Sequence, residues 1–178
     1  MSGGATGVMQ RAAEMRREFD RAFAEPVKFD EALKENFLAI RVGAQACAIR
    51  LSEVAGLFAD KKVTRVPGGH AALRGIAGFR GSTLPVYDLQ IFLGLGETQA
   101  PRWLVIAKAV PTALAFDVFE RQLRVPPDAV MPQSTRGKMQ TGIRGFLHTQ
   151  EFSGPIIHLP SVLDAIKALR IEAAPKEE

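Results

Sequence analysis

The sequence is poor in the residues that build disulfides and metal sites. Its 178 residues include one cysteine, Cys47, so no intramolecular disulfide can form, which is typical of a reducing compartment. The three histidines, His70, His148 and His158, do not lie at metal-ligand spacing. No apolar run approaches the roughly 20 residues of a membrane span, and the N-terminus lacks the apolar core of a secretory signal. We therefore expect a cytoplasmic protein with no direct membrane insertion.

The signatures of common enzymes are also missing. The glycine-rich stretches at residues 68–75 and 136–141 lack the Lys-Ser/Thr end of a phosphate-binding loop. No serine stands in a Gly-x-Ser-x-Gly motif. The sequence thus predicts no catalytic residue, no metal ligand and no cofactor.

Aromatic binding platforms are scarce as well. Proteins that bind single-stranded nucleic acid interleave aromatic and basic side chains, but this chain has one Trp and one Tyr, and its Lys and Arg residues are scattered at a net charge of +4. A small nucleic-acid-binding β-barrel is the alternative function of another class. We expect no nucleic-acid partner.

What the sequence does contain is alternating apolar residues. Over residues 37–51 two runs of period two flank Gly43, which predicts a β-hairpin with one buried side; the apolar face holds Leu38, Ile40, Val42, Cys47, Ile49 and Leu51. Cys47 is then a small core residue rather than a nucleophile. A second hairpin of the same design is expected over residues 103–118.

Four features recur in the same order along the chain. They are the hairpin, Arg-Val-Pro (65–67 and 124–126), Gly-Ile-x-Gly-Phe (75–79 and 142–146) and a proline-led apolar strand followed by a short helix (84–89 and 154–159). Glycine within a strand marks a bulge, a barrel corner or a close backbone approach. The recurrence predicts a tandem of two similar units of short strands, each closing into a small barrel.

The helices follow local signals. Asp88 is placed to N-cap a helix from Leu89, and Gly94 to end it. Ser161 is placed to N-cap the last helix, over residues 162–171. Over residues 8–26 an apolar stripe at helical spacing predicts an amphipathic helix, which lies on its own domain or binds a partner.

The stretch from Val66-Pro67 to Leu95 resembles the CheW family of chemotaxis coupling proteins. The family pattern is matched at Gly75, Arg80, Gly81, Leu84, Pro85, Val86, Asp88, Leu89, Leu93, Gly94 and Leu95. The resemblance extends over about residues 37–169. Three positions depart from the pattern: Gly56 replaces an acidic residue implicated in receptor contact, Gly78 an Asn, and Pro160 an Asp.

The resemblance implies an all-β fold of two tandem SH3-like five-stranded β-barrel subdomains with short helices, plus an N-terminal amphipathic helix and a C-terminal helix. The expected divisions are an N-terminal extension (1–36), a first barrel (37–98), a second barrel with the C-terminal helix (99–172) and a tail (173–178). A groove is expected between the barrels.

The implied function is that of an adaptor without catalysis. It joins the cytoplasmic tip of a chemoreceptor to the regulatory domain of a CheA-type histidine kinase, at membrane-associated receptor arrays. Because Gly56 departs from the family pattern, an adaptor of a CheW-type system controlling surface motility remains an alternative.

The resemblance also suggests which residues contact partners. Arg80, between glycines in a turn, is the first candidate for receptor contact, the alternative being a solvated or ion-paired arginine. Gly56 occupies a receptor-contact position. The apolar residues Val54, Leu57 and Phe58 either line a groove for a receptor helix or belong to the barrel core.

Two further groups complete the expected site. Loops near Val66 and Gly68, together with Gly81, are expected to dock the kinase. Gly75, Pro85, Asp88 and Gly94 are expected to be structural.

Overall fold

The computed structural model describes residues 34–67, 70–132 and 142–172. Its described residues from Glu35 onward belong to one compact unit. The helix expected over residues 8–26 and the tail at 173–178 lie outside the described residues.

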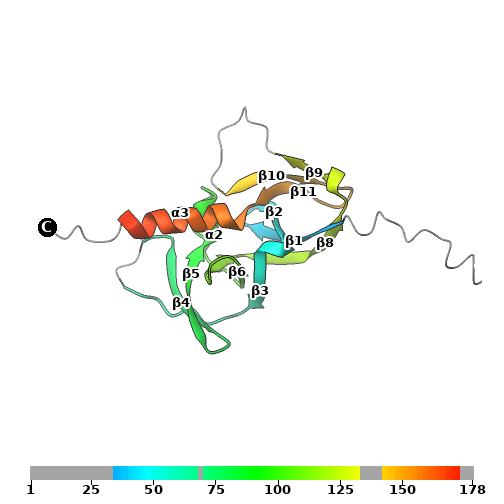
Figure 1. The fold of residues 1–178 in the computed structure, drawn as a ribbon. Helices are drawn as coiled ribbons and strands as arrows, with labels where there is room; N and C mark the ends of the chain where they lie inside the picture. The colour runs from blue at the N-terminus through cyan, green and yellow to red at the C-terminus, as the bar shows by residue number, and fades with distance from the viewer. Residues whose placement is uncertain (1–33, 68–69, 133–141, 173–178) are drawn as a thin grey trace, which may run out of the picture. The chain divides into compact units, whose positions relative to one another are not determined.

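The fold is mostly β, with two sheets and few helices (Figure 1). The first sheet has the strand order β8 (Val118–Val125), β1 (Glu35–Val42), β2 (Gln45–Arg50), β11 (Ser153–Ile157), β10 (Ile143–His148) and β9 (Val130–Pro132). The second has the order β3 (Val54–Ala59), β6 (Trp103–Ala107), β7 (Ala113–Phe116), β5 (Ser82–Asp88) and β4 (Leu73–Phe79). The helices are α2 (Leu89–Phe92) and α3 (Leu159–Glu172), with short 3₁₀ turns η2 (Leu51–Glu53) and η3 (Pro127–Ala129).

The strand pairing does not follow the expected division at residues 98 and 99. The hairpin β1–β2 comes from the first half of the chain but pairs with β8 and β11 from the second half. The hairpin β6–β7 in turn pairs with β3 and β5 from the first half. The two halves of the chain therefore have the same order of elements. The hairpin of each half, however, pairs with the strands of the other half. Only three residues, those of η2, link β2 to β3, so the chain passes directly from one sheet into the other.

The register of the sheets corrects two of the repeated motifs. Gly75 pairs with Val86, and Gly145 occupies the corresponding place opposite Ile156. The equivalent motifs are thus Arg-Gly-Ile at 74–76 and Arg-Gly-Phe at 144–146. The Gly-Ile-x-Gly-Phe motif aligned Gly75 with Gly142, three residues before its structural equivalent, Gly145. The Arg-Val-Pro motifs are not equivalent either, because the first follows the bridge at Thr64 whereas the second ends β8.

The hairpin strands are buried on both faces, where the sequence predicted one buried side. In β1, Leu38 and Ile40 face a central cluster that joins both sheets, whereas Phe37 and Ala39 face a smaller cluster of the first sheet. In β7, Leu114 faces the central cluster and Ala115 a cluster of the second sheet. Strands that are buried on both faces have near-continuous apolar sequences. The sequence therefore does not show which face of such a strand packs against which neighbour.

The central cluster holds the two sheets together. It contains β1 and β2 residues of the first sheet, β5, β6 and β7 residues of the second, and apolar residues of both helices. Cys47 is fully buried in it, and this burial raises the pKa of its thiol to about 12. The thiol is therefore neutral and protected at neutral pH, as expected of a core residue.

The two helices begin and end differently. At the end of α2, Gly94 has φ +70°, its N–H donates to Ile91 O and the N–H of Leu95 to Gln90 O, which is a Schellman motif. The last helix begins at Leu159, three residues before the predicted first helical residue, Val162. His158 precedes it and its carbonyl accepts the N–H groups of Ser161 and Val162. A proline is well tolerated in a first turn because it lacks an N–H there, so Pro160 does not delay the helix.

Candidate functional site

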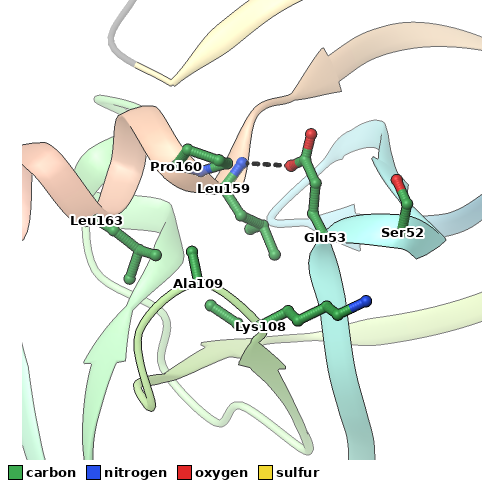
Figure 2. A pocket seen from close by; sticks show the side chains of 8 residues that line it. Ser52, Glu53, Lys108, Ala109, Leu159, Pro160 and Leu163 are labelled. Atoms are coloured by element: carbon green, nitrogen blue, oxygen red, sulfur yellow. Dashed lines mark hydrogen bonds between the residues drawn. The ribbon is translucent and has the colours of Figure 1, made fainter.

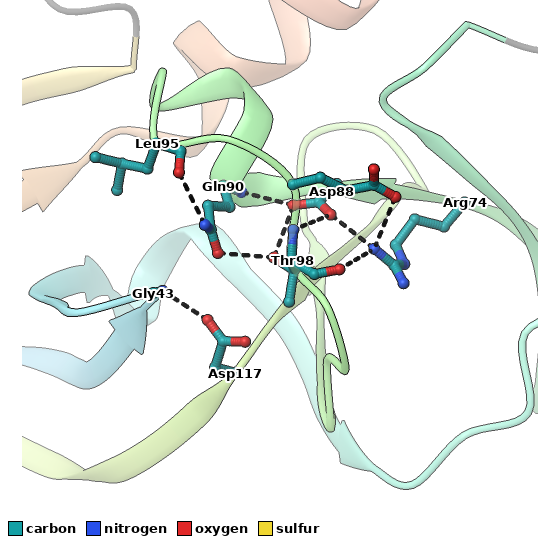
Figure 3. Close-up of polar contacts among 8 residues, drawn as sticks. Gly43, Arg74, Asp88, Gln90, Leu95, Thr98 and Asp117 are labelled. Carbon is teal, nitrogen blue, oxygen red and sulfur yellow. Dashed lines mark hydrogen bonds and ion pairs between the residues drawn. The ribbon is translucent and has the colours of Figure 1, made fainter.

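A buried polar network fixes the β4–β5–α2 segment (Figure 3). The Asp88 side chain is completely buried and accepts hydrogen bonds from the N–H of Gln90, the N–H and Oγ1 of Thr98, and Nη1 of Arg74 at 2.8 Å. Asp88 is thus the N-cap of α2 and also half of a buried ion pair. With four donors on one carboxylate, the role of Asp88 in this structure is architectural.

Gly75 and Pro85 lie next to this network for steric reasons. Gly75 has φ +142°, and a Cβ there would lie 2.0 Å from the carbonyl oxygen of Thr64, which only glycine permits. Pro85 pairs with Ile76 before the β5–β7 pairing begins at Val86. Ile76 exchanges its backbone bonds with Thr64 instead, so the missing N–H of Pro85 costs no ladder hydrogen bond.

Arg80 and Gly81 form the two-residue turn between β4 and β5. Phe79 pairs with Ser82, and both turn residues have positive φ, +45° at Arg80 and +85° at Gly81. This is the type I′ geometry, in which Asn-Gly or Gly-Gly is preferred. Arg80 is exposed, and it has no hydrogen bond or ion pair with the described residues.

An aromatic cluster lies beside this turn. The rings of Phe58 on β3 and Phe79 on β4 are 5.1 Å apart in an edge-to-face arrangement. The Lys61 ammonium lies 5.5 Å from one centroid and 5.6 Å from the other. Gly56 belongs to the same cluster, because a Cβ there would lie 2.8 Å from the Phe58 ring. Phe58 and Gly56 on β3 are thus brought to the same end of the second sheet as Arg80, which lies more than 20 residues further along the chain.

Val54 and Leu57 lie on a different side of β3. Both pack, half-buried, against the central cluster rather than against Phe58. Val54 pairs with Ala107, which lines an apolar pocket of about 310 Å³ together with Ser52, Glu53, Lys108, Ala109, Leu159, Pro160 and Leu163 (Figure 2). Val54 and Leu57 thus pack against the central cluster, away from the turn end of the second sheet, and neither is among the residues that line the pocket.

Glu53 and α3 build the wall of the pocket. The carboxylate Oε2 of Glu53 accepts the N–H of Leu159 at 2.8 Å, across 106 residues of sequence, as Figure 2 shows. A carboxylate at a helix N-terminus is stabilised by the helix dipole. Its other oxygen lies 4.0 Å from Nε2 of His158. The pocket residues carry no signal in the sequence, because only the folded chain brings η2 to the start of α3.

The residues expected to contact the kinase do not form one patch. Val66 is 42% exposed and lies two residues beyond Thr64, which pairs with Ile76. Because that pairing is antiparallel, Val66 lies toward the start of β4, whereas Gly81 follows the end of β4. Gly68 lies outside the described residues.

Neither a metal site nor a membrane span emerges from the described ranges. No three His, Cys, Asp or Glu side chains there are grouped to hold a metal ion. Among the helices of the described residues, none is long and apolar enough to cross a membrane.

The CheW-like domain model matches residues 36–167 of this chain. The protein therefore belongs to the CheW-like domain family of chemotaxis adaptor proteins.

A solved structure supports the fold. The scaffolding protein TtCheW from Thermoanaerobacter tengcongensis is similar with a TM-score of 0.63 at 18% sequence identity, over 71% of this chain and 91% of that chain. Among proteins of curated function, none matches the sequence.

Proposed function

We propose that this protein is an adaptor that couples chemoreceptors to a CheA-type histidine kinase, with its two sheets acting as SH3-like modules. Membership of the CheW-like family supports the adaptor role. The observation that carries the receptor half of the proposal is the exposed, strained Arg80. Its partners are the cytoplasmic tip of a receptor and the regulatory domain of the kinase.

Strain at Arg80 is the first part of the argument. A residue with a Cβ in the left-handed region costs about 1–2 kcal/mol relative to glycine. Arg80 has φ +45°, and no hydrogen bond or ion pair to another described residue holds its guanidinium. Backbone strain of this kind clusters at functional sites. A free guanidinium on a rigid turn is suited to a carboxylate, which it binds through two parallel hydrogen bonds. The receptor tip is then expected to present an acidic residue to Arg80.

The second part is the apolar surface on either side of β3. Phe58 and Gly56 lie at the Arg80 end of the second sheet, and Leu57 and Val54 pack half-buried against the central cluster. An amphipathic helix docks by inserting apolar side chains into such a surface. The four residues are proposed to bind a receptor helix whose acidic end reaches Arg80.

The kinase surface is proposed to lie at the opposite end of β4. There Val66 and Ile76, 42% and 38% exposed, offer apolar side chains close to the Thr64–Ile76 bridge. Gly81 shares the turn with Arg80, so its contribution to kinase binding is indirect if the two surfaces are separate. Gly68, two residues after Val66 in the sequence, is proposed to take part in the same contact.

Charge reversal at Arg80 tests the proposal. We expect Arg80→Glu to abolish capture of the full chain by receptor-containing membranes while its melting temperature stays nearly unchanged, because the side chain has no partner among the described residues. Arg121→Glu is the matched control: it makes the same charge change on β8, and it removes an exposed ion pair with Glu151 and an exposed hydrogen bond to the Glu151 carbonyl, both of small energy. Unchanged receptor binding by Arg80→Glu, or an equal loss in the control, would refute the receptor role.

A second variant separates strain from charge. Arg80→Asn places a residue preferred in this turn, so we expect it to raise the free energy of unfolding by about 0.5–1 kcal/mol and still weaken receptor binding. Pull-down with the kinase regulatory domain should be unaffected by both variants and reduced by Val66→Asp. A variant that lost kinase and receptor together would contradict two separate surfaces.

A further inference from the structure

Two residues with strained backbone lie at the same end of the second sheet. Among the described residues that are not glycine, only Asp60 and Arg80 have positive φ, at +54° and +45°. Asp60 directly follows β3, and Arg80 directly follows β4. The rings of Phe58 and Phe79, near the ends of these two strands, are 5.1 Å apart, so the two strand ends lie together. Strain of this kind persists only where the surrounding structure holds it, and it is concentrated at functional sites.

Asp60 is held in this conformation by Arg102. Aspartate enters the left-handed region more readily than most residues, and here its carboxylate accepts hydrogen bonds from Nε of Arg102 at 3.1 Å and from Nη2 at 3.2 Å. The Asp60 N–H donates to the Arg102 carbonyl at 2.8 Å. Backbone and side chain are thus both tied to the residue that precedes β6. The chain therefore leaves β3 in a fixed direction, which sets the position of Lys61.

Lys61 is positioned over the aromatic pair. Its ammonium lies 5.5 Å from the ring centroid of Phe58 and 5.6 Å from that of Phe79. A cation over an aromatic ring is attracted by the negative face of the ring. Lys61 is exposed and has no carboxylate partner among the described residues. The ring contacts therefore orient the positive charge without neutralising it.

We propose that Lys61 is a second receptor-contacting residue, which binds a carboxylate of the receptor tip beside the carboxylate that Arg80 binds. This inference rests on the proposed receptor function and specifies the partner: an acidic segment with two carboxylates, one for each cation. Arg80 follows Phe79, whose ring Lys61 covers, so both cations lie at one end of the second sheet. Ammonium and guanidinium groups form charge-assisted hydrogen bonds with carboxylates. An acidic segment thus matches both charges.

Nucleic acid fits this surface less well. Single-stranded nucleic acid binds on exposed aromatic faces that lie between basic residues. Phe79 is only 5% exposed, and Lys61 lies over both rings. The Phe79 ring therefore offers little surface on which a base can stack. The surface favours carboxylates over nucleotides.

Charge reversal at Lys61 tests the second contact, and Lys62 supplies the matched control. Lys62 is exposed, and it has no ring contact or ion pair among the described residues. We expect Lys61→Glu to weaken capture of the full chain by receptor-containing membranes about tenfold or more. Lys62→Glu makes the same change in net charge and should weaken capture less than about threefold, because long-range repulsion is screened by salt. Equal loss in both variants would overturn the contact at Lys61.

Two further substitutions separate charge from packing. Lys61→Arg keeps a cation that can cover the rings, so we expect receptor capture close to that of the native chain. Lys61→Met keeps an apolar stem without the charge, so capture should fall while the melting temperature stays nearly unchanged. Native capture by Lys61→Met, or no rescue by Lys61→Arg, would show that the charge of Lys61 is not what the receptor binds.

The result at Arg80 distinguishes failure of this inference from failure of the proposed function. If Arg80→Glu loses receptor capture while Lys61→Glu keeps it, the second contact is refuted and the proposed receptor site stands. If both variants keep it, the proposed receptor site is refuted as well. Fluorescence anisotropy with an oligothymidylate gives the remaining outcome: binding that is lost in Lys61→Glu would assign this surface to nucleic acid and refute the acidic partner.

Discussion

Neighbouring backbone decides which glycines of the repeated motif are replaceable. A Cβ on Gly75 would lie 2.0 Å from Thr64 O, and one on Gly145 would lie 2.7 Å from Met131 O. Gly78 has no atom within 4 Å of its would-be Cβ and no positive φ. Gly75 and Gly145, which occupy equivalent places, thus allow the adjacent backbone segment to lie close, whereas Gly78 has no such neighbour.

This contrast gives a stability prediction. Gly75→Ala is expected to lower the free energy of unfolding by at least about 2 kcal/mol, from positive-φ strain and the clash with Thr64 O. Gly78→Ala should be neutral or stabilising by up to about 1 kcal/mol, because glycine is unfavourable inside a strand. Urea denaturation of both variants measures the difference, and equal effects would contradict the close-approach explanation.

Local signals predicted single residues well where the partner is near in sequence. The Asp88 cap bonds Gln90 two residues on, and Gly94 ends a helix of four residues. Arg74, the buried partner of Asp88, was not predicted, because the pairing depends on β4 lying beside β5. The positive φ of Arg80 also escaped prediction, since arginine is not a residue that signals a type I′ turn.

At the scale of elements, α3 depends on a side chain from another part of the chain. Glu53 satisfies the Leu159 N–H, one of the groups that a helix leaves unpaired at its start. The sequence proposed Ser161 as the cap, and Ser161 instead bonds Nδ1 of His158 at 2.8 Å. The apolar stripe of this helix was predictable, but its first turn was not. In the sequence Pro160 indicates a helix boundary, whereas in the structure it lies in the first turn of α3.

The Glu53 contact can be measured. Glu53→Ala should lower the free energy of unfolding by about 1–2 kcal/mol, as for loss of a helix N-cap. Glu53→Gln keeps an acceptor for the Leu159 N–H but loses the charge at the helix terminus, so it should cost about half as much. Thermal or urea unfolding gives both values, and a larger loss for Gln than for Ala would argue against capping.

The hairpins illustrate what periodicity can and cannot predict. Strands at residues 37–42 and 46–51 were expected and are observed as Glu35–Val42 and Gln45–Arg50. Their partners were not predictable, since Phe37 and Leu38 are both apolar and nothing in the run tells which face meets which sheet. The exchange of hairpins is therefore invisible in the sequence even though the repeat itself is visible.

At the scale of the whole molecule, the two sheets share one central cluster. Leu38 and Ile49 of the first sheet are in it together with Val105 and Leu114 of the second. Separating the sheets would expose these side chains, and each buried aliphatic side chain contributes about 1.5–3 kcal/mol. The sheets are therefore expected to unfold together.

Two native probes report on the sheets separately. Trp103 is the only tryptophan and lies on β6, and Cys47 is the only cysteine and lies on β2. We expect Trp103 fluorescence and pulsed thiol labelling of Cys47 to give the same urea midpoint. A protected Cys47 after the fluorescence transition is complete would show that the first sheet is stable alone.

Hairpin exchange also constrains how the protein is made. The second sheet lacks β6 and β7, two of its five strands, until Phe116 has left the ribosome. In the first sheet, β2 cannot pair with β11 until Ile157, the last residue of β11, has been synthesised. During synthesis the β1–β2 hairpin is thus an early product without its final neighbours. A chain that ends between Phe116 and Ile157 would expose the apolar β1–β2 hairpin without its β11 neighbour. We expect such a chain to be bound by chaperones or degraded by proteases.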